Sequence, residues 1–169
     1  ANPHYLLNDL KLILNLSALR GAQGIGIGFL NNKKFQIHRE NTYIKKFINN
    51  IKFKYEILNI LKSQNKIFSI FGQTRLPIIG DKIIKQNNAP IETKELIGIH
   101  NGNIIYKNLN FNNLEFSKKS DSRILFEDIS KIYRKHENKF ETVMIEYLKN
   151  LKGEYNIMIY LKHEKCFYI

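Results

Sequence analysis

The chain has 169 residues, of which 43% are hydrophobic and 12% aromatic, a composition typical of one globular domain and not of a disordered chain. No apolar run approaches the roughly 20 residues of a membrane span, and no secretion leader is visible, so we expect a cytoplasmic protein without membrane contact. The single cysteine, Cys166, excludes an internal disulfide, and the five scattered histidines lack zinc-ligand spacing. We expect no metal site.

The net charge of +12 leaves two interpretations open. A basic surface is typical of proteins that contact nucleic acid or an acidic partner. Lys, Asn and Ile are, however, common along the whole chain, and a genome rich in A and T would produce that bias without selection for binding. Nucleic acid is therefore a weakly supported partner.

The first elements in chain order are a helix and a glycine-rich strand. Asn2-Pro3 is typical of a helix start, apolar residues follow at helical spacing from Leu6 to Ala18, and Gly21 can end the helix. Gly24–Leu30 alternates glycine with large apolar residues, which predicts a strand that another backbone or a ligand approaches closely.

The middle of the chain predicts shorter elements. A second strand is expected at Lys33–Arg39, an amphipathic helix at Glu56–Ser63 and a buried strand at Lys66–Gly72. Residues 73–95 contain prolines and glycine that break any regular pattern, so we expect an irregular segment there.

Leu96–Tyr106 consists of two apolar runs around Asn101-Gly102, which predicts a tight hairpin turn. On its own this pair indicates a plain chain reversal. The elements expected after it are two amphipathic helices and two strands: Asp121–His136 with Ser120 as cap, Phe140–Leu151, Glu154–Leu161 and Lys165–Ile169.

Six short segments carry a resemblance through their order along the chain. They are SALRGAQGIGIGF (Ser17–Phe29), FGQTRLP (Phe71–Pro77), NNAPI (Asn87–Ile91), GIHNGNI (Gly98–Ile104), KSDSRIL (Lys119–Leu125) and LKGEYNIMIYL (Leu151–Leu161). This series resembles the glutamine-hydrolysing domain of the class II glutamine amidotransferases, the N-terminal-nucleophile type of glucosamine-phosphate synthase and asparagine synthetase. The resemblance covers roughly residues 5–161.

The resemblance implies a glutamine site without a cofactor. Arg75 matches the arginine that holds the glutamine α-carboxylate, with Thr74 beside it, and Asp121 matches the aspartate that binds the α-ammonium group. Taken alone, Arg75 is equally explained as a surface or ion-pairing arginine, and Asp121 as a favourable charge at a helix start.

Asn101 and Gly102 match the two donors of the family's oxyanion hole, and Arg20, with the glycine after it, matches a pair that supports the nucleophile end of the pocket. The family's nucleophile is an N-terminal cysteine. This chain has Ala1 there, and alanine cannot attack an amide.

The implied fold is α+β, a four-layer αββα sandwich of two antiparallel sheets between helices, formed by residues 1–169 as a single domain short at both ends. The implied function is a glutaminase domain that releases ammonia for a partner synthase domain or subunit. The alternative is an inactive amidotransferase-like module that serves as a structural or binding subunit of a larger assembly that could contain nucleic acid.

Overall fold

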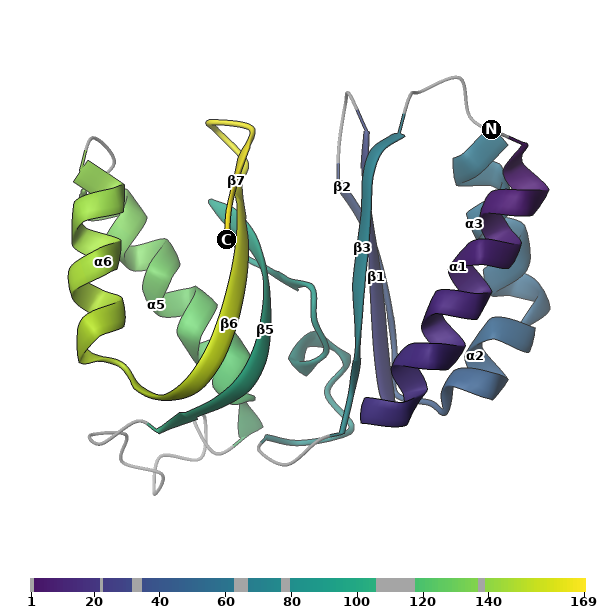
Figure 1. Ribbon diagram of the computed structural model, residues 1–169, viewed down its shortest axis with the longest axis horizontal. Helices are drawn as coiled ribbons and strands as arrows, with labels where there is room; N and C mark the ends of the chain where they lie inside the picture. Colours follow the sequence, from purple (N-terminus) through teal and green to yellow (C-terminus); the bar gives the residue numbers. More distant parts are fainter. Residues whose placement is uncertain are drawn as a thin grey trace. The chain divides into compact units, whose positions relative to one another are not determined.

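A computed structural model divides the chain into two compact units. The N-terminal unit comprises Ala1–Pro77 and Asn88–Pro90, and the C-terminal unit comprises Ile78–Asn87 and Ile91–Ile169. Each unit contains one antiparallel sheet and its own hydrophobic core (Figure 1). The residues that the structure describes are 2–21, 23–31, 35–62, 67–76, 80–105, 118–136 and 139–169.

The sheet of the N-terminal unit has the strand order β2-β1-β3, and its helices cover one face of it (Figure 1). The strands are β1 (Gly24–Asn31), β2 (Phe35–Glu40) and β3 (Ile67–Arg75). The helices are α1 (Pro3–Ser17), the 3-10 turn η1 (Ala18–Arg20), α2 (Ile44–Asn49) and α3 (Ile51–Lys62). Helix α1 begins as predicted, because the Asn2 side chain accepts a hydrogen bond from the His4 backbone N–H at 2.9 Å.

Glycine and large apolar residues alternate along β1, so its two faces contact different neighbours. Ile25, Ile27 and Phe29 are fully buried in the core beneath the helices. The intervening glycines face the other way, where a Cβ on Gly24 would lie 2.5 Å from the Asn88 side chain, and one on Gly26 would meet the Ala89 carbonyl oxygen. The prediction of close backbone approach to this strand is confirmed.

The C-terminal unit has the strand order β4-β5-β6-β7. The strands are β4 (Ile91–Glu92), β5 (Leu96–Ile105), β6 (Lys152–Leu161) and β7 (Cys166–Tyr168), and the helices are α5 (Asp121–Lys135) and α6 (Phe140–Asn150). Both helices pack on one face of this sheet (Figure 1), with Leu125, Phe126 and Ile129 fully buried against Leu96 and Leu161. None of the helices in the described ranges is long and apolar enough to cross a membrane.

Asn87 organises the irregular segment that leads into this sheet. Its buried side-chain amide donates to the backbone oxygens of Asp81 and Lys118, each at 2.8 Å. Its Oδ1 accepts from the Ser120 N–H at 3.1 Å. Three hydrogen bonds from one side chain therefore fix the approach to α5.

The predicted hairpin turn at Asn101-Gly102 is wrong. Both residues lie inside β5, which pairs without interruption with β6 from Leu96 to Ile105. An Asn-Gly turn needs the two flanking runs to pair with each other, and here both pair with the same neighbour. The glycine is still required, because Gly102 has φ +138° and a Cβ there would meet the Glu154 carbonyl oxygen.

Other expectations differ mainly in their boundaries. Helix α3 begins at Ile51, five residues before the expected start, and α2 was not predicted. Strand β3 continues to Arg75, so the expected irregular segment begins only after it and contains the short turn η2 (Lys85–Asn87) and β4. Tyr106, expected at the end of the hairpin, lies outside the described residues. The α+β class with two antiparallel sheets is confirmed, whereas the single-domain assignment stays a prediction.

Candidate functional site

In the N-terminal unit, the structure brings together two of the six segments. A Cβ on Gly21 would lie 2.6 Å from the Leu76 nitrogen and 2.8 Å from the Arg75 carbonyl carbon. The Gln23 N–H donates to the Arg75 oxygen at 3.1 Å, and the Thr74 hydroxyl donates to the Ser17 carbonyl at 2.8 Å. The end of α1 and the end of β3 are therefore fixed to each other, and glycine at position 21 permits this close approach.

Thr74 and Arg75 are partly exposed at the end of β3. The Thr74 hydroxyl is used in the bond to Ser17, so its direct role is to hold the strand end. Arg20 closes η1, and its side chain lies outside the described residues, as does Ala1.

In the C-terminal unit, Asn101 and Gly102 are exposed within β5, opposite Asn156 and Tyr155 of β6. Side chains alternate along a strand. Gly98 and His100 face α5, since a Cβ on Gly98 would meet the Phe126 ring and the His100 ring contacts Ser122. Asn101 therefore points to the face of this sheet that α5 does not cover.

Asp121 is the first residue of α5 and lies beside the buried cap residue Ser120. The Ser120 hydroxyl accepts from the Arg123 N–H at 3.2 Å, as predicted for the cap. Asp121 Oδ1 accepts from the Ser122 N–H at 2.8 Å, and its side chain is 15% exposed. The helix N-terminus favours the negative charge of this carboxylate.

His100 joins β5 to the start of α5, and sequence reasoning did not find it. Its Nδ1 lies 2.9 Å from the Ser122 hydroxyl oxygen and 3.9 Å from Asp121 Oδ2. Burial lowers the pKa of His100, against the weaker raising effect of the Asp121 carboxylate, so the ring is neutral at pH 7. The signal in the sequence was a histidine inside an apolar run, directly before Asn101.

Ser122, His100 and Asp121 include the three residue types of a hydrolytic triad, but their geometry differs from one. In a triad the serine and the aspartate contact opposite nitrogens of the imidazole. Here both oxygens lie near Nδ1. The arrangement is suited to holding Asp121 in place and not to activating the Ser122 hydroxyl.

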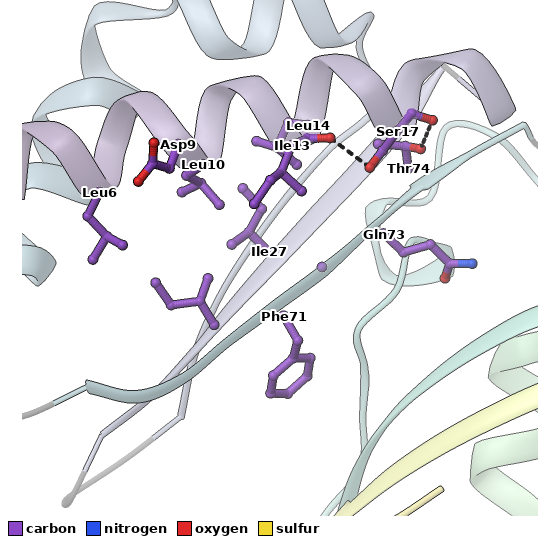
Figure 2. A pocket seen from close by; sticks show the side chains of 12 residues that line it. Leu6, Asp9, Leu10, Ile13, Leu14, Ser17, Ile27, Phe71, Gln73 and Thr74 are labelled. Atoms are coloured by element: carbon purple, nitrogen blue, oxygen red, sulfur yellow. Dashed lines mark hydrogen bonds between the residues drawn. The ribbon is translucent and has the colours of Figure 1, made fainter.

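A cavity of about 220 Å³ lies between α1 and β3 of the N-terminal unit (Figure 2). Its α1 wall is mainly leucine and isoleucine, including Leu10 and Ile13, and its floor is the backbone and side chains of β3. Asp9 is the one charged side chain among the described residues that line it. None of the described lining residues offers a cation to a carboxylate such as that of glutamine, so the described lining does not identify this cavity as the expected substrate site.

The described residues offer little evidence for a metal site or for a reactive thiol. No cluster of three or more His, Cys, Asp or Glu side chains in these ranges could hold a metal ion. Burial and a contact with the Glu164 carboxylate raise the pKa of the Cys166 thiol, which lies 3.4 Å from Glu164 Oε2. A protonated thiol is a poor nucleophile, so these surroundings do not favour Cys166 as a nucleophile.

No protein-family model matches this sequence, and no curated protein is significantly similar to it. Among solved structures, the chain is similar to glutamine phosphoribosylpyrophosphate amidotransferase from B. subtilis complexed with ADP and GMP. The TM-score is 0.58 at 21% identity, and the match covers 89% of this chain and 31% of that one. This chain thus shares its α+β fold, two antiparallel sheets with flanking helices, with about a third of that amidotransferase.

Proposed function

We propose that this chain is a glutamine amidotransferase module that releases ammonia from glutamine for a partner synthase. One observation carries the proposal. Segments far apart in the sequence meet in pairs: the Gly21 turn packs against Arg75, and the strand before Asn101 contacts the start of α5 beside Asp121. The fold shared with an amidotransferase over 89% of the chain supports it.

The proposed roles follow from the chemistry of glutamine. The planar guanidinium of Arg75 can bind the α-carboxylate with two parallel hydrogen bonds. The Asp121 carboxylate, held at a helix start, can bind the α-ammonium group. The Asn101 amide and the Gly102 N–H would stabilise the oxyanion that forms when a thiolate attacks the side-chain amide, by about 3 kcal/mol for each well-placed donor.

A second candidate is a module that binds glutamine without hydrolysing it. The one cysteine of the sequence is Cys166, and burial and the Glu164 carboxylate raise the pKa of its thiol, which disfavours the reactive thiolate. The net charge of +12 adds the proposal of an anionic partner such as nucleic acid.

The deciding experiment measures glutamine binding by calorimetry and ammonia release by a coupled assay, on protein with its verified native N-terminus. Arg75→Ala and Asp121→Ala should abolish binding while leaving the circular-dichroism spectrum unchanged. Arg134→Ala and Asp128→Ala are the matched controls, because both are partly exposed ion-pairing residues of α5 that lie outside the proposed site, and both variants should bind as the parent does.

Each outcome separates the candidates. Ammonia release supports the glutaminase. Binding without ammonia supports the binding module, and no binding by the parent overturns both. Retention on nucleic acid that falls steeply with salt would support the anionic partner, because phosphate contacts release counterions.

A further inference from the structure

His100 is a buried polar residue that the proposed glutamine chemistry does not use. It is 3% exposed and lies on β5 directly before Asn101. A buried imidazole costs free energy unless its nitrogens are bonded. The other residues on this face of β5 are apolar, so we expect the imidazole of His100 to make a polar contact that offsets the cost of burying it.

That contact runs to the first turn of α5. The Ser122 hydroxyl lies 2.9 Å from His100 Nδ1, and the Ser122 N–H donates to Asp121 Oδ1 at 2.8 Å. Ser122 thus connects the imidazole to the carboxylate with one side-chain and one backbone hydrogen bond. Asp121 Oδ2, the other carboxylate oxygen, lies 3.9 Å from the same nitrogen.

The side chains that face His100 leave the negative charge of Asp121 available for an ammonium ligand. Helix α5 presents Asp121 and Ser122 to the ring, and β6 places the apolar Ile157 opposite His100. Because burial keeps the imidazole neutral at pH 7, it orients the carboxylate without neutralising it. A lysine or arginine in this place would compete with the ligand for Asp121.

We infer that His100 is a positioning residue that, through Ser122, holds the Asp121 carboxylate where it binds the α-ammonium group of an amino-acid ligand. This inference rests on the proposed function. It adds that recognition of the ammonium group depends on a residue of the same strand that carries Asn101 and Gly102.

The test compares two ligands, L-glutamine and glutaramate, which is glutamine without its α-amino group. His100→Gln and Ser122→Ala should each weaken glutamine binding about tenfold, the effect of losing one hydrogen bond in a buried network. Neither variant should change the affinity for glutaramate, since that ligand makes no ammonium contact. A merely structural role would weaken both ligands equally.

Three further variants sharpen the result. His100→Asn keeps a polar group near the Nδ1 position and should restore binding to within about threefold of the parent. The double variant His100→Gln/Ser122→Ala should lose no more than either single variant, because both act through one contact. His136→Gln, at the exposed C-terminal end of the same helix, should have no effect.

The outcomes distinguish this inference from the proposed function. A parent chain that binds no glutamine overturns both. A parent that binds glutamine while His100→Gln binds it equally well overturns only the inference, as does an equal loss for both ligands. A tenfold loss confined to glutamine supports it.

Discussion

Replacing Gly26 by alanine tests the packing of Asn88–Pro90 on β1. The new methyl group would overlap the Ala89 carbonyl oxygen, with the carbonyl carbon at 2.8 Å and Pro90 Cδ at 3.2 Å. These are backbone and ring atoms that cannot rotate away. The segment must move, which strains the hydrogen bonds from Asn88 to Glu40 and from Arg39 to the Pro90 oxygen.

These contacts determine how much Gly26→Ala should lower the free energy of unfolding. Overpacking a tight site costs about 1–3 kcal/mol, and each weakened hydrogen bond adds about 1 kcal/mol. The alanine recovers about 0.5–1 kcal/mol by restricting the unfolded chain. With two weakened hydrogen bonds, we therefore expect a net loss of about 2–4.5 kcal/mol, which for a chain of this size lowers Tm by about 4–18 °C.

Gly28→Ala is the matched control, measured in the same thermal and urea unfolding experiments. The added methyl group would meet the end of the Phe35 ring, which packs on Phe71 with 4.9 Å between ring centroids, and would only touch Pro90 Cγ, at 3.4 Å. Moving the end of a side chain costs less than moving backbone, so the loss should be smaller than for Gly26→Ala, about 1 kcal/mol. Equal stability of Gly26→Ala and the parent, or an equal loss in the two variants, would refute the assignment of this strand face to the Asn88–Pro90 segment.

Further predictions concern the C-terminal unit. Burial lowers the pKa of His100, so below about pH 6.5 the unfolded chain binds a proton that the folded chain does not. The contribution of His100 to the free energy of unfolding is therefore full above that pH and falls as the pH decreases, by at most about 1.4 kcal/mol per pH unit. In urea titrations, the free energy of unfolding of His100→Asn should fall less steeply with decreasing pH than that of the parent. Asn87→Ala removes three hydrogen bonds and should cost about 3 kcal/mol in the same assay, whereas a loss under 1 kcal/mol would contradict its organising role. Ser120→Ala should cost about 1 kcal/mol through the lost cap.

Local patterns in the sequence predict most of the elements, because their causes are local. The cap at Asn2 and the apolar spacing of α1 act within one turn of helix, and the glycine alternation of β1 shows that something must pack on that face. The identity of that neighbour, Asn88–Pro90, depends on a contact between residues about 60 positions apart, which no local pattern encodes.

For the candidate site, too, sequence motifs point to some residues, whereas other features depend on contacts with distant parts of the chain. The motifs predict Arg75 and Asp121 as site residues, which stays a prediction, and the structure places them at a strand end and a helix start. The Asn101-Gly102 turn was mispredicted because the pairing partner of both flanking runs is β6, more than 50 residues later. His100 was missed because a buried histidine has no spacing rule, and only the fold shows that it meets Ser122.

The path of the chain near Asn87 has a consequence for folding cooperativity. Asn87 is bonded within the C-terminal unit, while the next residue, Asn88, is bonded to Glu40 and Asn41 of the N-terminal unit. Consecutive residues are thus bonded to separate units. Releasing either attachment lengthens the connecting segment, and each doubling of such a loop changes its closure entropy by only about 0.6 kcal/mol. This connection therefore does not force the units to unfold together, and hydrogen exchange of β1 and β5 amides should report separate opening free energies.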